Sequence, residues 1–244
     1  MPPEFLIPEW PASARVRAAC TLRAGGASSA PFDSLNLGAH VGDDPAAVAE
    51  NRRRVAAALA LPAEPLWLEQ VHGTAVAEAG TASARTVADA VLARSAGEVA
   101  VIQVADCMPV LFADRAGTAV AAAHAGWRGL AAGVLEATVR ALALPPERLL
   151  AWLGPAIGPE HFEVGGEVRA AFVAKNPAAE RAFSANERGR WQCDLGELAR
   201  QRLAALGISA VYGGSWCTFA DRDRFFSYRR DGRCGRMGAL IWLV

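Results

Sequence analysis

Two apolar runs that flank a short turn signal place the strongest constraint on the fold of this chain. Residues 110–114 read VLFAD, residues 118–124 read TAVAAAH, and the turn-forming segment DRAG occupies residues 114–117 between them. Apolar, strand-length runs separated by a Gly-containing turn predict an antiparallel β-hairpin. The pattern therefore favours a sheet with antiparallel pairs over a purely parallel sheet.

Other segments add both strands and helices. Helices are predicted at 43–62, with Asp43 or Asp44 as the cap before Pro45, at 126–146, and at 194–207, where Asp194 and Glu197 form a capping box. Further short apolar runs predict strands, at 65–71, 87–93, 98–104, 149–154, 208–214 and 238–244. Because strands and helices are mixed without strict alternation, we expect a mixed-sheet α+β fold and one domain over residues 1–244.

Composition narrows the class of protein. The 244 residues include 52% hydrophobic and 20% charged residues, with 25 basic and 25 acidic side chains. A neutral chain is not typical of proteins that bind nucleic acid or anionic membranes. The start resembles no signal peptide, and the five cysteines include no CxxC pair, which indicates reduced thiols. We therefore expect a cytoplasmic protein with no nucleic-acid, membrane or obligate protein partner.

The hairpin brings two reactive side chains together. A turn centred between residues 115 and 116 places Leu111 opposite Val120, and the same register places Cys107 opposite His124. Directly opposed residues have Cβ atoms about 4.5–5.5 Å apart. Pro109 cannot donate to the strand ladder, which leaves the register near Cys107 open.

His72, in the segment LEQVHG, follows another predicted strand. Three ligands from His and Cys, with a fourth position open, are typical of a catalytic zinc site. The same residue types also occur as ordinary core cysteines and hydrogen-bonded histidines, and spacing alone does not place His72 beside the hairpin.

Seven segments in order carry a resemblance to a known family. They read NLGAHVGDDPAAVAENR, WLEQVHG, ADCMPVLFAD, AAAHAGWRGL, AWLGPAIGPEHFEVG, CDLGELA and FFSYRRDGRCGRMGALIW. The series resembles the bacterial laccase-domain family, whose members are also described as multicopper polyphenol oxidases, peptidoglycan editing factors and purine nucleoside phosphorylases. The likeness runs from about Asn36 to the C-terminus.

This resemblance implies a layered sandwich with mixed β-sheets flanked by helices, related to cysteine–histidine hydrolase-like folds. It implies that His72, Cys107 and His124 are zinc ligands. It also implies phosphorolysis of adenosine, inosine and methylthioadenosine to free base and sugar 1-phosphate, together with adenosine deamination. Copper binding is a further property attributed to the family.

Other residues are candidates for catalysis and substrate binding. For deamination, Zn²⁺ lowers the pKa of a bound water, and a non-ligand carboxylate acts as the general acid and base. Asp106 and Glu69 are the carboxylates nearest in sequence, and Asp106 has a structural role as its alternative. For phosphate binding, the candidates are Arg128, Arg229 with its neighbour Arg230, and Arg52, while His40 is a candidate ribose or base contact.

Three alternatives remain open. A copper polyphenol oxidase could use the Cys and two His ligands, but the trinuclear cluster of a laccase needs more histidines than the four present. A metal-free hydrolase would use Cys107 as nucleophile and His124 as base. An editing factor in peptidoglycan precursor quality control would need no open metal position.

Overall fold

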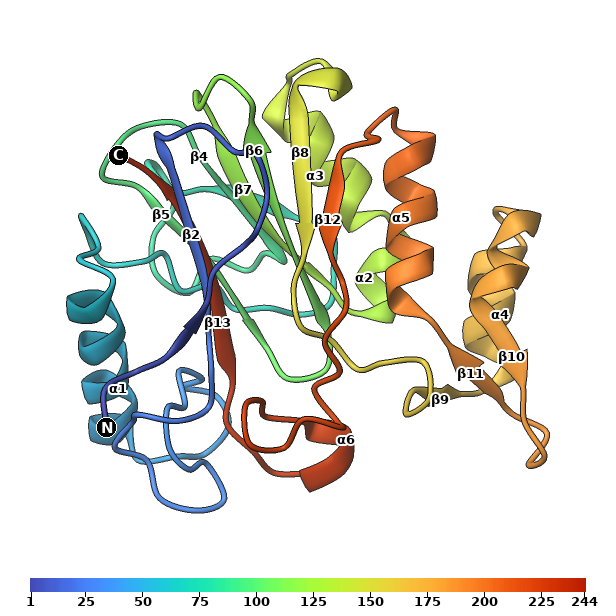
Figure 1. The fold of residues 1–244 in the computed structure, drawn as a ribbon, viewed down its shortest axis with the longest axis horizontal. Coiled ribbons are helices and arrows are strands. Elements are labelled where there is room, and N and C mark those ends of the chain that lie inside the picture. The colour runs from blue at the N-terminus through green and yellow to red at the C-terminus, as the bar shows by residue number, and fades with distance from the viewer.

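The computed structural model describes residues 1–244 and arranges most of them in layers (Figure 1). A six-stranded and a four-stranded sheet pack face to face. Helix α1 covers the outer face of the four-stranded sheet, and helices α2, α3 and α5 lie against the outer face of the six-stranded sheet. A small three-stranded sheet and helix α4 lie beyond α5. The predicted mixed-sheet α+β fold is confirmed.

The strands form three sheets of different topology. The four-stranded sheet has the order β1 (Phe5–Leu6), β2 (Val16–Thr21), β13 (Met237–Leu243) and β5 (Val99–Val104), with every pair antiparallel. The six-stranded sheet has the order β12 (Val211–Gly213), β8 (Leu149–Leu153), β6 (Met108–Asp114), β7 (Val120–Ala125), β4 (Ala90–Ala93) and β3 (Val76–Glu78). Its two edge pairs are parallel and the others are antiparallel. The small sheet has the order β10 (Phe183–Ala185), β11 (Trp191–Cys193) and β9 (Glu163–Val164).

The helices are short, apart from the first and the fifth. The six α-helices are α1 (Pro45–Ala58), α2 (Trp127–Ala132), α3 (Val134–Leu142), α4 (Gly166–Val173), α5 (Leu195–Ala205) and α6 (Tyr228–Asp231). Two 3-10 helices occupy Pro146–Arg148 and Pro177–Ala182. No helix is long and apolar enough to cross a membrane.

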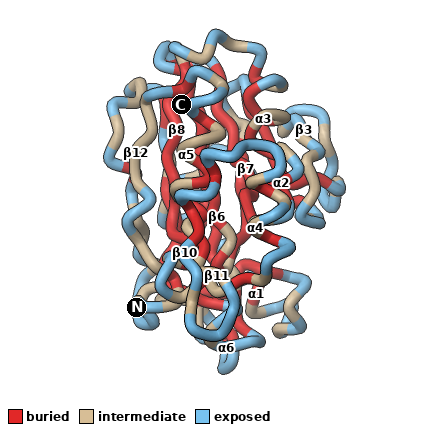
Figure 2. Tube along the Cα trace, turned by 90° about the vertical axis from the view of Figure 1, so that its right-hand side faces the viewer, coloured by how far each residue is buried: buried red, intermediate tan, exposed pale blue.

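The central strands are buried on both faces, as Figure 2 shows for β6, β7 and β8. Along β6, Val110 and Phe112 point to the layer beneath the helices, while Leu111 and Ala113 point between the two sheets. This alternation follows from the two-residue repeat of a strand. Because both faces are covered by apolar layers, these strands read as nearly continuous apolar runs.

The predicted hairpin forms, but the predicted register is wrong by two residues. His124 lies opposite Pro109 and Leu111 lies opposite Ala122, instead of the expected Cys107 and Val120. The connection spans residues 115–119, and Gly117 in it has φ +68°, a conformation that favours glycine. The turn is therefore centred one residue later than expected, and Cys107 lies just before β6 begins.

Two of the three predicted helices match closely. Asp44 caps α1 by accepting a hydrogen bond from the Ala46 amide, and Asp194 caps α5 by accepting one from the Glu197 amide. The third predicted helix, at 126–146, is divided into α2 and α3. Gly133 separates them in a left-handed conformation with φ +107°, which an α-helix cannot continue through.

Candidate metal centre and its pocket

Three chain segments bring His72, Cys107 and His124 together. His72 lies in the loop before β3, Cys107 in the turn between β5 and β6, and His124 near the end of β7. Their ligand atoms all lie within 4.8 Å of one another, and Cys107 Sγ is 3.8 Å from His72 Nε2. Bond lengths of about 2.0–2.3 Å in a tetrahedral zinc site put neighbouring ligand atoms about 3.5 Å apart. The group is thus close to the size that one metal ion requires.

Asp89 is the orienting residue that the sequence analysis missed. It is fully buried just before β4, and its Oδ1 is 2.8 Å from Nδ1 of His124. Its carboxylate also accepts hydrogen bonds from the amides of Val71, His72 and Gly73. One carboxylate therefore fixes both the His124 ring and the loop that carries His72. The available signal was an acid directly before the apolar run AVLA.

The charge balance of the group suits a metal-binding thiolate. Burial would raise the pKa of Cys107, but the charges of His124 and His72 and their hydrogen bonds to the thiol lower it to about 6. Burial would lower the pKa of His124, but the Cys107 thiolate and Asp89 raise it to about 9. A thiolate and two imidazoles are donors that bind zinc and copper well. The residues present therefore fit a metal ion.

The backbone at His72 and Gly126 leaves space for the Cys107 thiol and the His72 imidazole. His72 has φ +62°, an uncommon value outside glycine, and the hydrogen bonds to Asp89 hold it there. Gly126 precedes α2, and a Cβ atom at this position would lie 2.6 Å from Cys107 Sγ and 3.2 Å from Cδ2 of His72. Only glycine leaves the thiol and the imidazole in their present places.

The group lies in a pocket of about 520 Å³. Of the residues predicted to bind substrate, His40, Arg128 and Arg229 line this pocket, and so does Asp106. Trp127, Phe162 and Tyr228 supply aromatic surface. A pocket with a metal-binding group, aromatic walls and cationic side chains is suited to a small aromatic ligand that carries or meets an anion.

Asp106 is held by the chain itself. Its Oδ1 accepts a hydrogen bond from the Thr218 hydroxyl at 2.6 Å, and its Oδ2 accepts one from the Arg229 amide at 2.7 Å. Its carbonyl oxygen accepts a further hydrogen bond from the amide of Ile157. These contacts hold Asp106 at φ +83° and join the turn that carries Cys107 to α6.

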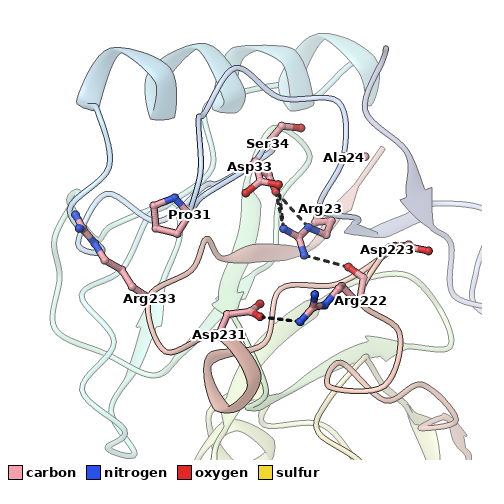
Figure 3. A pocket seen from close by; sticks show the side chains of 9 residues that line it. All are labelled: Arg23, Ala24, Pro31, Asp33, Ser34, Arg222, Asp223, Asp231 and Arg233. Carbon is pink, nitrogen blue, oxygen red and sulfur yellow. Dashed lines mark hydrogen bonds and ion pairs between the residues drawn. The ribbon is translucent and has the colours of Figure 1, made fainter.

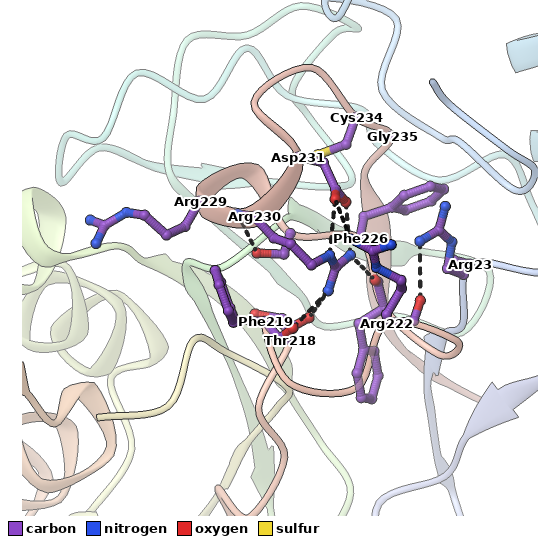
Figure 4. Close-up of polar contacts among 12 residues, drawn as sticks. Arg23, Thr218, Phe219, Arg222, Phe226, Arg229, Arg230, Asp231, Cys234 and Gly235 are labelled. Atoms are coloured by element: carbon purple, nitrogen blue, oxygen red, sulfur yellow. Dashed lines mark hydrogen bonds and ion pairs between the residues drawn. The ribbon is translucent and has the colours of Figure 1, made fainter. Parts of the chain in front are cut away.

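The predicted arginines separate into two groups. Arg128 is exposed at the pocket, and Arg229 donates to the carbonyl of Glu163 and lies beside the Phe162 ring. Arg230 points the other way, and its guanidinium donates to three carbonyl oxygens and pairs with Asp231 (Figure 4). The Arg230 guanidinium is thus already paired inside the protein. The expectation that it offers donors to phosphate is therefore not met.

Arg52 also differs from the expectation. It does not line the pocket, and its guanidinium donates to the carbonyl of Leu37 and stacks 3.8 Å from the Trp67 ring centroid. The physical reason is that α1 presents Arg52 to the loop that leads toward His40. Its charge still reaches His40, whose pKa is lowered by burial and by the charges of Arg236 and Arg52.

A second depression, of about 590 Å³, lies between residues 23–34 and 222–233 (Figure 3). Arg23 there pairs with Asp33 and donates to the carbonyl of Arg222, and Arg222 lies 3.9 Å from Asp231. Four of its charged side chains already pair with one another, so the pocket around Cys107 is the better candidate site.

Comparison with known proteins places the chain in a family. Residues 17–244 match the family described as multi-copper polyphenol oxidoreductase laccase. The chain belongs to this family. The resemblance inferred from the seven motifs is thereby confirmed.

Relatives in the laccase family cover nearly the whole chain. A purine nucleoside phosphorylase of Pseudomonas aeruginosa is 59% identical, with 98% of each chain covered, and purine nucleoside phosphorylase YfiH of Escherichia coli is 53% identical over 99% of each. Among solved structures, a Neisseria meningitidis protein is 50% identical, with a TM-score of 0.95 over 98% of each chain. YlmD of Geobacillus stearothermophilus is 34% identical, with a TM-score of 0.88 over 94% of this chain and 92% of that one. The relatives' names support an enzyme.

Proposed function

We propose that the protein is a zinc-dependent purine nucleoside phosphorylase that acts on adenosine, inosine and methylthioadenosine. The observation that carries the proposal is the His72–Cys107–His124 group inside a pocket with aromatic and cationic walls. In the reaction, phosphate attacks C1′ of the ribose, the glycosidic bond breaks, and sugar 1-phosphate and free purine leave. The names of the close relatives support this substrate class.

His72, Cys107 and His124 would hold the zinc ion, which supplies a Lewis acid to the pocket. Arg128 and Arg229 contribute cationic groups for phosphate, because guanidinium groups bind its oxygens in pairs. Trp127 and Phe162 offer surfaces on which a purine ring can stack. His40 is assigned a ribose or base contact, and burial and neighbouring arginines favour its neutral form.

Adenosine deamination, in which water replaces the 6-amino group, is proposed as a second activity of the same pocket. Asp106 is assigned a positioning role, because both of its carboxylate oxygens already accept hydrogen bonds from Thr218 and Arg229. The five cysteines are free thiols, which supports a cytoplasmic location.

A metal-free hydrolase is the second candidate function. The Asp89, His124 and Cys107 side chains form a chain of contacts in which the pKa of the thiol falls to about 6, as in nucleophilic cysteines. A copper oxidase has less support. Of the four histidines, His40 is not part of the metal-binding group and His161 stacks on Phe219 elsewhere. Too few histidines remain for a trinuclear copper cluster.

The test measures metal content by mass spectrometry together with adenosine turnover, with and without phosphate, for wild type, Cys107→Ala and the control Cys217→Ala. We expect about one zinc per chain in wild type and in the control, and the loss of both zinc and turnover in Cys107→Ala. Phosphate dependence separates phosphorolysis from deamination. A metal-free protein whose Cys107 reacts with thiol reagents, and whose His72 is dispensable, would support the hydrolase instead.

A further inference from the structure

Gln103 presents an unpaired carboxamide in the wall of the pocket. Its side chain lines the pocket, the residue is only 5% exposed, and its Oε1 is buried without a hydrogen-bond partner. Buried polar atoms without partners are rare in folded proteins, because they lose their hydrogen bonds to water. An unpaired atom of this kind in a pocket wall indicates a ligand group that pairs with it.

The backbone around this carboxamide is held on both sides. On one side, Gln70 accepts a hydrogen bond from the Gln103 amide at 2.8 Å and donates one to the Gln103 carbonyl at 2.9 Å. On the other side, Gln103 pairs with Gly238 of β13. The flanking residues Ile102 and Val104 pack between the two sheets, so Gln103 points to the opposite face of β5. The strand is thus fixed while the carboxamide itself is not.

A carboxamide carries an acceptor oxygen and a donor NH₂ group, and a half-turn about its last bond exchanges them. Adenosine has a 6-amino group that donates, whereas inosine has a 6-oxo group that accepts. A side chain held by other residues would match only one of these purines. A side chain with no hydrogen bond to its oxygen can match either by turning.

We propose that Gln103 hydrogen-bonds the substituent at C6 of the purine and thereby lets one pocket accept both 6-amino and 6-oxo nucleosides. The inference rests on the proposed nucleoside phosphorylase function and deepens it. Gln70 cannot take this part, because its own carboxamide is used by the Gln103 backbone. Gln103 is therefore a specificity-determining residue that the sequence motifs did not single out.

The test compares kcat/KM for adenosine, inosine and purine riboside, which has no substituent at C6, in the presence of phosphate. The variants are Gln103→Leu, Gln103→Glu and the control Gln201→Leu on α5. We expect Gln103→Leu to lower kcat/KM about tenfold for adenosine and inosine but to leave purine riboside unchanged. Gln103→Glu can only accept, so the ratio of adenosine to inosine should rise about tenfold.

Equal losses of kcat/KM for all three nucleosides would show that Gln103 has a merely structural role. Unchanged kcat/KM in both Gln103 variants would show that Gln103 does not contact the purine. Either result overturns the inference. Calorimetric measurement of adenosine and inosine binding to wild type separates failure of the Gln103 proposal from failure of the phosphorylase proposal. If wild type turns over the nucleosides but the Gln103 variants lack the expected changes in selectivity, only the Gln103 proposal is rejected. Absence of both turnover and binding in wild type rejects the phosphorylase function, and with it the inference.

Discussion

Asp89 lies within hydrogen-bond distance of four donors, three backbone amides of residues 71–73 and the imidazole of His124. Burial opposes its ionisation, but the hydrogen bonds from His124 and Gly73 outweigh burial and lower the pKa of Asp89. A carboxylate on Nδ1 of a metal-binding histidine directs Nε2 toward the ion and makes it a better ligand. At the scale of single residues, the proposed centre therefore depends on a side chain that would not itself bind the ion.

Gly126→Ala tests how tightly the ligands are confined. The new Cβ would lie 2.6 Å from Cys107 Sγ, so the thiol must leave its present position beside the two histidines. We expect zinc to bind at least about tenfold more weakly, since ligand geometry sets affinity, while the metal-free protein keeps its melting temperature. Competition with a chromophoric chelator measures the affinity.

Gly166→Ala is the matched control, because a Cβ there meets nothing within 4 Å and Gly166, the first residue of α4, also lies at the start of a helix. Its zinc affinity should equal that of wild type. Equal zinc affinities of the Gly126 and Gly166 variants would show that the Cys107 thiol is not confined by Gly126.

At the scale of elements, an ion pair between a buried carboxylate and a partly exposed arginine links the β6–β7 hairpin to the start of β8. Asp114 ends β6, has a fully buried side chain, and receives two hydrogen bonds from the Arg148 guanidinium at 3.0 and 2.7 Å. Thr118 of the turn donates to the same carboxylate. Burial would raise the pKa of Asp114, but Arg148 and Thr118 lower it to about 2.

Asp114→Asn should lower the free energy of unfolding by about 1.5–3 kcal/mol at pH 7, because it removes the charge from a buried carboxylate that accepts hydrogen bonds from Arg148 and Thr118. A lowered pKa means that the ion pair stabilises the fold fully above about pH 4 and is lost as the pH falls through 2. Urea unfolding at a series of pH values should show the gap to wild type closing near pH 2. Glu50→Gln, at an acid that pairs with Arg53 and Arg54 on the surface of α1, should change stability much less, because exposed ion pairs are weak. A gap that is independent of pH would argue against the pair.

Local sequence signals predicted the positions of the main helices and strands better than they predicted how the strands pair. The caps at Asp44 and Asp194 placed α1 and α5 well, because cap chemistry acts within a few residues. The hairpin register depended on where one glycine, Gly117, takes positive φ, which apolar patterning does not reveal. The short strands of the 163–193 region and helix α4 went unpredicted, because two- and three-residue strands carry almost no periodic signal.

The residues of the candidate site also divide into those that the sequence revealed and those that only the structure shows. Reactive residue types marked Cys107 and His124, and the family resemblance implied all three ligands. Asp89 was missed because its importance comes from burial and from partners more than 15 residues away along the chain. Gln103 was missed because only the fold shows that its carboxamide oxygen is buried without a partner. Arg52, which lies in an arginine run, was a weaker phosphate candidate than Arg128 from sequence, and the structure separates them further, because Arg52 stacks on Trp67 while Arg128 lines the pocket.

At the scale of the whole molecule, the candidate centre lies where the two large sheets are joined. Cys107 is in the turn that leads from β5 of the four-stranded sheet to β6 of the six-stranded sheet, and His124 is in β7. An ion held by both residues would link the connection between the sheets to one of the sheets. Metal binding and global stability should therefore be coupled.

Zinc at 100 times its dissociation constant should stabilise the folded state by about 2.7 kcal/mol. For a chain of this length that corresponds to a rise in melting temperature of about 5–10 °C. Differential scanning calorimetry with zinc and with a chelator measures the shift. Cys107→Ala should abolish the shift, and Cys217→Ser should keep it. A shift that persists in Cys107→Ala would place the stabilising ion elsewhere.

The position of β13 has a consequence for the order in which the protein assembles during its synthesis. β13 follows every other element in the chain, yet it lies between β2 and β5 in the four-stranded sheet. The ribosome adds about 5–20 residues per second, so β2 waits about 10–40 s before its inner neighbour exists. Until then, β2 and β5 each expose an unpaired edge in the crowded cell. We expect nascent chains of this protein to engage chaperones until the last strand is released.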